Sequence, residues 1–384
     1  MARYLVTGGA GFIGSHVVDD LVERGHEVRV VDDLSTGSRD NLAAHADIDL
    51  IAADLADPKV AAAAVADVDY VVHMAAMPSV PRSVKEPRRA HRANVDATFE
   101  LLLASRGSRV RRVVLASSAS VYGDSAARRQ HERLRPAPLS PYALHKLVGE
   151  QYAELFNRLH GLETVALRFF NVFGPRQSPD SQYASVIPRF AAALLVCRPG
   201  DTQLNSPYTL PMNHSVFARS RCLERPRDSA TNFGDRTLAG GTPTIHGDGE
   251  QTRDFTYVAD AVRGVVQACA GPAAARVVNI ARGEALSVNA LCSMLQRITG
   301  AHERARHADD LTGGVRHSQA DVSLARDLLG FAPAVPVEEG LRRTMDWYRR
   351  RMPPARRPAQ PRGLDAVRGD PRPADPPPGG RPRS

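Results

Sequence analysis

A tyrosine and a lysine stand four residues apart near the start of a predicted helix over residues 141–159. Tyr142 and Lys146 therefore share one face of that helix. A nearby ammonium group, helped by the positive charge of an oxidised nicotinamide, lowers the pKa of a phenol so that the phenol can act as a base. The chain has only three lysines, the others being Lys59 and Lys85, and arginine supplies the remaining fixed positive charge. A lysine retained beside a tyrosine in such a sequence predicts proton transfer, although an ordinary amphipathic helix could also carry the pair.

A glycine-rich turn begins directly after the first apolar run of the chain. Residues 2–7 predict a buried strand, and Gly8, Gly11 and Gly14 follow before helical periodicity starts at residues 15–22. Small residues are needed there because a pyrophosphate must lie against bare backbone N–H groups at the positive end of a helix. This strand, turn and helix together predict a dinucleotide-binding site.

Two acidic residues end the second predicted strand, which covers residues 27–31. Asp32 and Asp33 stand where a carboxylate accepts hydrogen bonds from the adenosine ribose hydroxyls. The same negative charge repels a 2'-phosphate, so the sequence favours NAD over NADP as the cofactor.

Strand and helix patterns alternate through the first half of the chain. Further strands are predicted over 48–53, 68–72, 110–116 and 164–170, with helices over 58–66, 88–105 and 141–159. This alternation predicts an α/β fold, a doubly wound parallel sheet with helices on both faces, whose ligands bind at the carboxyl ends of the strands. We expect an NAD-binding domain over residues 1–170, a smaller mixed α/β substrate domain over 171–351, and a disordered tail over 352–384.

The composition is that of an ordinary soluble globular protein, with 43% hydrophobic and 24% charged residues among 384. No apolar run reaches the roughly 20 residues that a membrane span needs. The first strand begins too close to Met1 for a cleavable signal peptide. Cys197, Cys222, Cys269 and Cys292 have neither C-x-x-C nor disulfide-framework spacing, so they predict reduced thiols in a cytoplasmic protein and no metal site.

Much of the formal net charge of +8 lies at the end of the sequence. Arginine and proline dominate from Arg349 onward, and such a segment cannot bury enough apolar surface to order itself. No aromatic residue is interleaved with these arginines. We therefore expect a solvated tail, with no nucleic acid or membrane as a partner.

Three motifs together resemble a known family. They are Gly8-x-x-Gly11-x-x-Gly14, the serine that precedes Val121-Tyr122-Gly123, and Tyr142-x-x-x-Lys146. This combination resembles the extended short-chain dehydrogenase/reductases, in their NAD-dependent epimerase/dehydratase group. The stretches 78–83, 168–174 and 245–255 resemble nucleotide-sugar 4-epimerases, particularly UDP-N-acetylglucosamine and UDP-glucose 4-epimerases. The resemblance covers most of residues 1–350 and implies a Rossmann fold, bound NAD and a homodimer joined through the helices at 88–105 and 141–159.

The resemblance also implies roles for individual residues. Ser118 would hydrogen-bond the C4 oxygen of the sugar, Tyr142 would be the base and later the acid, and Lys146 would bridge the nicotinamide ribose. Cofactor contacts are implied for Gly8, Gly11, Phe12, Ile13, Gly14, Asp32, Asp33, Asp54, Leu55, Ala75, Asn94, Tyr142 and Lys146. Substrate contacts are implied for Ser79, Ser118, Asn171, Arg253 and Ser318.

The reaction that the resemblance implies is redox-neutral. Tyr142 would take the C4 hydroxyl proton as hydride passes from C4 to NAD, and hydride would return to the other face of the 4-keto sugar. Dehydratases of the family carry an acidic pair beside the active-site serine or threonine, whereas Ser118-Ala119-Ser120 contains no carboxylate. Ser318 matches a position where a bulky tyrosine restricts some epimerases to unacetylated sugars. We therefore expect UDP-GlcNAc and UDP-GalNAc as substrates, and UDP-Glc and UDP-Gal as possible further ones.

Two features depart from the family pattern. Residues 196–237 form a polar, aperiodic insert between the predicted helix at 183–195 and the next strand. Leu311 and Gly314 stand where relatives have a phosphate-binding arginine and a ribose-binding aspartate, and Arg316 is the candidate replacement. Two alternatives therefore stay open, a decarboxylase or reductase of sugar nucleotides from the same family, and a non-catalytic NAD-binding protein.

Overall fold

The computed structural model of the chain describes residues 1–45, 47–178, 185–196, 242–302, 304–309 and 315–351. Several sequence predictions concern residues outside this set, namely the insert beyond its first residue, Leu311, Gly314 and the tail over 352–384. Residues Met1–Met352 form one compact unit, and the domain boundary expected at residue 170 stays a prediction.

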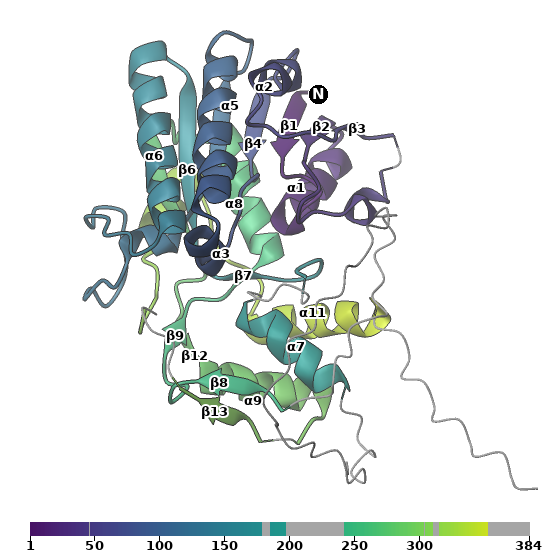
Figure 1. The fold of residues 1–384 in the computed structure, drawn as a ribbon, viewed down its shortest axis with the longest axis vertical. Helices are drawn as coiled ribbons and strands as arrows, with labels where there is room; N and C mark the ends of the chain where they lie inside the picture. Colours follow the sequence, from purple (N-terminus) through teal and green to yellow (C-terminus); the bar gives the residue numbers. More distant parts are fainter. Residues whose placement is uncertain (46, 179–184, 197–241, 303, 310–314, 352–384) are drawn as a thin grey trace, which may run out of the picture. The chain divides into compact units, whose positions relative to one another are not determined.

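Seven parallel strands form the central sheet, in the order β11-β6-β5-β4-β1-β2-β3 (Figure 1). Their bounds are β1 Arg3–Thr7, β2 Glu27–Val31, β3 Asp49–Ile51, β4 Tyr70–His73, β5 Arg112–Ser118, β6 Glu163–Phe169 and β11 Arg276–Ile280. The strand order reverses at β1, which has β2 on one side and β4 on the other. A crevice for a ligand opens at such a reversal. The predicted doubly wound parallel sheet is confirmed.

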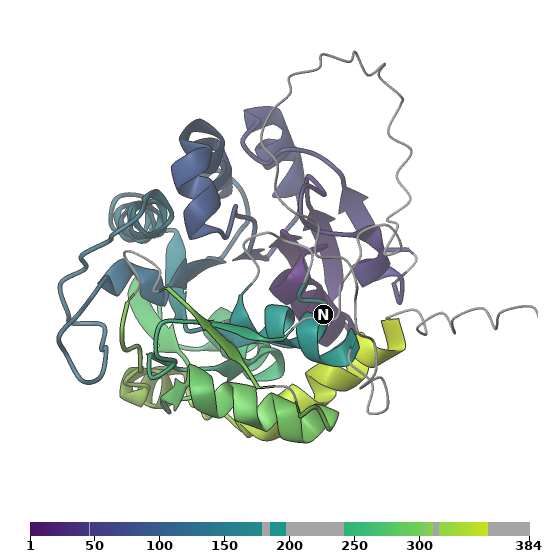
Figure 2. The same ribbon diagram turned by 60° about the horizontal axis from the view of Figure 1, so that its bottom comes forward.

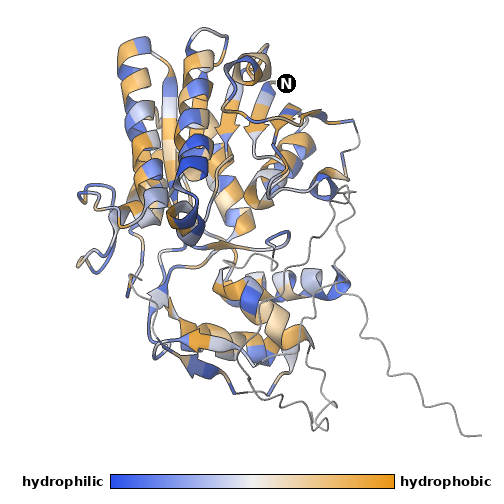
Figure 3. Cartoon of the chain, in the orientation of Figure 1, coloured by the Kyte–Doolittle hydropathy of each residue, from blue (hydrophilic) through white to orange (hydrophobic). Residues whose placement is uncertain are grey.

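Helices cover both faces of this sheet, because its strands are apolar on both sides. Leu5 and Val6 are neighbours in β1 with opposite side-chain directions, and both are fully buried. Figure 3 shows the predominantly apolar strands of the sheet. One face carries α1 (Phe12–Glu23) and α8 (Val258–Ala270), and the other carries α2 (Pro58–Ala64), α5 (Ala97–Arg106) and α6 (Pro141–His160).

The helix predicted over residues 88–105 is interrupted. After the short α3 (Val80–Lys85), α4 spans Pro87–His91, a π-helical turn spans Arg92–Asp96, and α5 follows. The period of apolar residues in the sequence does not reveal the extra residue in such a turn. π-helical turns occur often at functional sites, and this one carries Asn94 and adjoins the cavity described below.

The later chain forms small sheets and a second group of helices (Figure 2). The strand pairs are β7 (Val172–Phe173) with β10 (Thr256–Tyr257), β9 (Thr252–Arg253) with β12 (Leu286–Ser287), and β8 (Thr244–His246) with β13 (Arg306–Ala308). The helices are α7 (Val186–Val196), α9 (Val288–Thr299), α10 (Ser323–Leu329) and α11 (Val337–Arg351). Strand β11 returns to the central sheet beside β6, so later residues contribute to both parts. No helix among the described residues is long and apolar enough to cross a membrane.

Candidate active site

A cavity of about 620 Å³ opens where the order of the sheet reverses. Its walls come from the turns that follow β1, β2, β4 and β5, and from the first turns of α6. The predicted site residues that line it are Gly8, Gly11, Phe12, Ile13, Gly14, Asp32, Asp33, Asp54, Leu55, Ala75, Ser79, Ser118, Tyr142, Lys146 and Asn171. Asn94, Arg253 and Ser318 are the predicted site residues that do not line it.

The glycine turn forms a close-packed cradle at the end of β1. Gly8 has a φ of +67°, and a Cβ on it would lie 2.7 Å from the backbone nitrogen of Ala75. A Cβ on Gly14 would overlap the carbonyl oxygen of Gly8. Gly11 begins α1 without a side-chain cap, so the first amides of this helix are not occupied by a capping side chain. This arrangement fits a pyrophosphate at the helix N-terminus.

The two acids at the end of β2 have different surroundings. The Asp32 carboxylate is buried and accepts the N–H groups of Ala10 (3.0 Å) and Leu34 (2.8 Å), so it also fixes the glycine turn. Burial raises the pKa of Asp32, and these two hydrogen bonds oppose that rise. Asp33 is exposed and accepts the N–H of Ser35 at 2.9 Å. Both carboxylates line the cavity, as an adenosine ribose would require.

The opposite wall comes from the ends of β3 and β4. The Asp54 carboxylate pairs with Arg92 from the π-helical turn, at 2.9 Å. Asn94 lies behind the cavity, where its amide oxygen accepts the N–H of Met77 at 2.7 Å. Asn94 therefore holds the segment after β4 in position. It supports the wall of the cavity but does not line the cavity itself.

Ser118, Tyr142 and Lys146 all line the cavity, and the side chains of Ser118 and Tyr142 are hydrogen-bonded to each other. Ser118 ends β5, and α6 begins with the capping residue Ser140 and with Pro141, so Tyr142 and Lys146 fall on its first two turns. The Lys146 ammonium lies 6.0 Å from the centre of the Tyr142 ring.

The electrostatics of this group are dominated by burial. Burial raises the pKa of the Tyr142 phenol, while a hydrogen bond with the Ser118 side chain lowers it. Burial also lowers the pKa of Lys146 to about 8, and the negative charge of Glu150 opposes this. On balance the pKa of the Tyr142 phenol is therefore raised, and the structure does not show the lowered value that the sequence predicts. The charge of a protonated Lys146, and that of a bound nicotinamide ring, would each favour the phenolate.

The predicted substrate residues divide into two groups. Ser79 and Asn171 line the cavity beside Tyr142. Arg253 on β9 is partly buried, and its guanidinium donates to the carbonyl oxygens of Thr252 (2.7 Å) and Arg316 (3.3 Å). Ser318 is 6% exposed and donates to the Gln130 side chain at 3.3 Å.

Arg316, the candidate replacement for a phosphate-binding arginine, has a different partner. Its guanidinium makes a two-point ion pair with Asp248, at 3.0 and 2.6 Å, and this pair lowers the pKa of Asp248 to about 2. A phosphate contact from Arg316 would therefore compete with an existing carboxylate.

Four arginines line the cavity although the sequence analysis assigned them no role: Arg82, Arg89, Arg92 and Arg176. Arg176 pairs with Asp19 of α1 at 2.7 Å, and Arg82 lies 3.5 Å from Glu86. Arg82 belongs to the stretch 78–83 that carried the family resemblance, and this was the signal that could have identified it. The others are separated from any motif, so only the folded chain identifies them.

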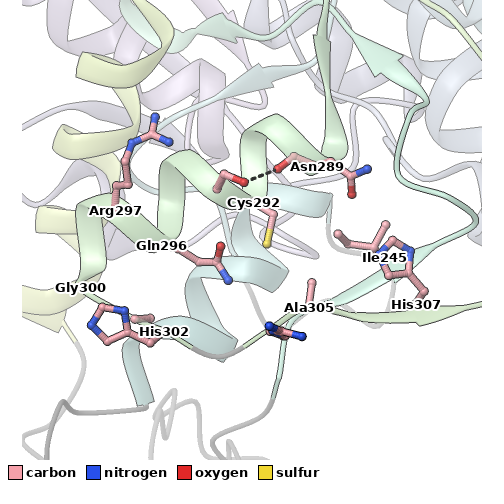
Figure 4. A pocket seen from close by; sticks show the side chains of 12 residues that line it. Ile245, Asn289, Cys292, Gln296, Arg297, Gly300, His302, Ala305 and His307 are labelled. Atoms are coloured by element: carbon pink, nitrogen blue, oxygen red, sulfur yellow. Dashed lines mark hydrogen bonds between the residues drawn. The ribbon is translucent and has the colours of Figure 1, made fainter.

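A second cavity, of about 760 Å³, lies between α9, β8 and β13 (Figure 4). Its lining includes Ile245, Cys292 and the exposed His302 and His307. Burial raises the pKa of the Cys292 thiol, which makes it a poor nucleophile. Among the described residues, no carboxylate lines this cavity.

Comparison with known proteins places the chain in a family. Residues 4–202 and 195–281 match the NAD dependent epimerase/dehydratase family. The chain belongs to this family. It is therefore an NAD-dependent enzyme, and the cradle around Gly8 and the carboxylates at the end of β2 fit that cofactor.

Three relatives illustrate the similarity. The UDP-glucose 4-epimerase of Mycolicibacterium smegmatis is 33% identical over 352 residues, which cover 90% of this chain and 98% of that one. The UDP-N-acetylglucosamine 4-epimerase of Methanobrevibacter ruminantium, solved with UDP-N-acetylmuramic acid, is 34% identical with a TM-score of 0.78, over 91% of this chain and 99% of that one. The UDP-glucuronic acid 4-epimerase of Bacillus cereus, solved with UDP-glucuronic acid and NAD, is 28% identical with a TM-score of 0.74, over 91% and 99%.

Proposed function

We propose that this protein is a nucleotide-sugar 4-epimerase that interconverts UDP-GlcNAc and UDP-GalNAc. The observation that carries the proposal is that Ser118, Tyr142 and Lys146 all line the first cavity, with Ser118 and Tyr142 hydrogen-bonded to each other. The acids lining that cavity, Asp32, Asp33 and Asp54, come from the ends of β2 and β3. None of them adjoins Ser118 in β5, so an elimination that needs a carboxylate beside the reacting carbon is not supported.

The side chains divide the acid–base work. Bound NAD supplies the acceptor and donor of hydride at C4. The Tyr142 oxygen takes the proton of the C4 hydroxyl and later returns it, while Ser118 hydrogen-bonds the same sugar oxygen. The Lys146 ammonium stabilises the Tyr142 phenolate. Asn171 in the cavity and Arg253 on β9 are the proposed contacts of the UDP diphosphate.

The choice of sugar rests on a small residue and on one relative. Serine at position 318 does not line the cavity itself, but it has no bulk to exclude an N-acetyl group, and the Methanobrevibacter relative acts on UDP-N-acetylglucosamine. The Mycolicibacterium and Bacillus relatives act on UDP-glucose and UDP-glucuronic acid. Among further relatives, a UDP-glucuronic acid decarboxylase of Xenopus tropicalis, 29% identical over 91% of this chain and 73% of that one, makes decarboxylation the second candidate activity.

The test incubates the purified protein with UDP-GlcNAc, UDP-Glc and UDP-GlcA separately, without added NAD, and separates the products by chromatography. We expect UDP-GalNAc to form from UDP-GlcNAc. The rate of its formation should fall by about 10²-fold or more in Tyr142→Phe. Tyr152→Phe on the same helix is the matched control and should keep full activity, because Tyr152 packs against Phe99 outside the cavity.

Other outcomes would replace this proposal. A 4-epimer formed from UDP-Glc or UDP-GlcA alone would replace UDP-GlcNAc as the assigned substrate. A UDP-pentose formed from UDP-GlcA would identify a decarboxylase. Absence of any product, with NAD bound to the purified protein, would leave a non-catalytic NAD-binding protein.

We further infer a homodimer in the cytoplasm. Helix α6 exposes Leu144, Leu155 and Leu159, and exposed leucines on one helix favour burial against a second copy. Cys269 and Cys292 are buried free thiols, which suits a reducing compartment. Light scattering tests the dimer, and Leu159→Glu should shift it toward the monomer.

A further inference from the structure

A buried carboxylate lies one helical turn beyond Lys146 in α6. Glu150 is 6% exposed and does not line the cavity. Its carboxylate accepts the Ser117 hydroxyl and two N–H groups of Arg168 on β6, at 2.8 and 2.6 Å. Ser117 precedes Ser118 in β5, so these hydrogen bonds join the strand that carries Ser118 to the helix that carries Tyr142 and Lys146.

Arg168 is itself held in place by its surroundings. The Glu150 side chain that it binds is therefore also held in place. Arg168 is 3% exposed, and its guanidinium lies 4.6 Å from the centre of the Tyr122 ring. The Tyr122 hydroxyl donates to the Asn279 side chain at 2.7 Å. The Glu150 carboxylate thus accepts three hydrogen bonds inside the protein, from groups that are themselves held in place.

The negative charge of Glu150 favours the protonated form of Lys146. Its ammonium donates to the carbonyl oxygen of Ala116 at 2.8 Å, and burial disfavours the protonated form. The titratable groups that interact with Lys146 are Tyr142, His145 and Glu150 from α6 and His73 from β4, and Arg168 from β6 binds Glu150. Burial holds the pKa of His73 at about 3, and it is therefore neutral. Glu150 is the fixed anion of this group.

We propose that Glu150 is a positioning residue that keeps Lys146 protonated and fixes the end of β5, with Ser118, against α6. The proposal deepens the proposed function and rests on it for the role of Lys146. Glu150 lies eight residues from Tyr142, about 12 Å along the helix, but only about 6 Å along it from Lys146. Its charge therefore acts on the phenol chiefly through the ammonium.

The scarcity of lysine makes a direct measurement practical. Protein labelled with lysine that carries ¹³C at Cε should give three lysine signals in the NMR spectrum, and Lys146→Arg assigns one of them. Lys59 and Lys85 are exposed and serve as internal references. We expect the Lys146 signal of the NAD-bound protein to titrate well below the two references.

The variant that tests the proposal is Glu150→Gln, which keeps the shape and removes the charge. We expect the Lys146 transition to fall by about one further pH unit, because loss of a nearby opposite charge disfavours the ionised form. The pH above which activity is lost should fall together with the Lys146 transition. Glu163→Gln is the matched control, since Glu163 also pairs with an arginine across β5 and β6, Arg112 at 2.6 Å, but at the other end of the strands. Glu163→Gln should leave the titration of all three lysine signals unchanged.

Two further variants keep the test decisive if Glu150→Gln does not fold. Glu150→Asp keeps the charge and should keep the Lys146 transition near that of the wild type. Glu150→Gln with Arg168→Met removes both buried charges and should lower it. An unchanged Lys146 transition in a folded variant without the Glu150 charge would overturn the proposal. The titration needs no substrate, so failure of the epimerase assay and failure of this inference are separate results.

Discussion

At the scale of the residue, the proposed chemistry depends on a lysine whose pKa lies close to neutral pH. Burial lowers the pKa of Lys146 from 10.5 to about 8, so the ammonium is present below about pH 8 and lost above it. We expect kcat/KM to fall above pH 8, because the neutral amine no longer stabilises the Tyr142 phenolate. In Lys146→Arg the alkaline fall near pH 8 should disappear, since a guanidinium stays charged. The overall rate should still drop about 10²-fold, because the planar group cannot replace the compact ammonium.

The pH profile of epimerisation for the two proteins checks this prediction. Lys85→Arg in α3 is the control, because Lys85 is exposed outside the cavity, and it should change neither the rate nor the profile. If Lys146→Arg kept the fall near pH 8, a group other than Lys146 would be responsible for it.

At the scale of the element, a comparison of two glycines distinguishes the effect of backbone strain from the effect of a close contact. Gly8 and Gly25 both have positive φ, +67° and +78°, but only Gly8 has neighbours within reach of a Cβ. Gly25→Ala should therefore lower the free energy of unfolding by about 1–2 kcal/mol and leave NAD bound. Gly8→Ala should cost more and release NAD, because its Cβ would displace the backbone at Ala75. Urea unfolding and the NAD content of the purified proteins measure both effects, and full NAD content in Gly8→Ala would refute this account of the cradle.

The elements themselves were largely predictable from the sequence, but many side-chain partners were not. Leu5 and Val6 in the middle of β1 are apolar because both faces of this strand are buried, and α6 begins at Pro141 after the capping residue Ser140, as capping rules predict. The π-helical turn at Arg92–Asp96 depends on packing that no apolar period reports. The ion pair between Glu150 and Arg168 joins residues whose proximity only the sheet register creates.

At the scale of the whole molecule, the cavity that we expect to hold NAD joins segments distant in sequence. Residues of the glycine turn, the end of β2, the π-helical turn and α6 all line it. A ligand that binds only the folded chain adds to its stability, by about 2.7 kcal/mol at one hundred times its Kd. For a unit of this size we expect NAD to raise the Tm of the stripped protein by about 4 °C.

NADP should raise the Tm of the stripped protein much less than NAD at the same concentration, because Asp32 and Asp33 place two carboxylates where the 2'-phosphate would lie. Asp33 is the residue to change, since Asp32 also holds the glycine turn through Ala10. In Asp33→Asn the rises in Tm caused by NAD and by NADP should become more similar. The substitution removes one negative charge near the 2'-phosphate while the side chain keeps its size. Glu23→Gln, on the exposed end of α1, removes one charge away from the cavity and should leave the difference intact. Thermal unfolding with each nucleotide measures these shifts, and equal stabilisation of the wild type by both would show that the acids at the end of β2 do not select the cofactor.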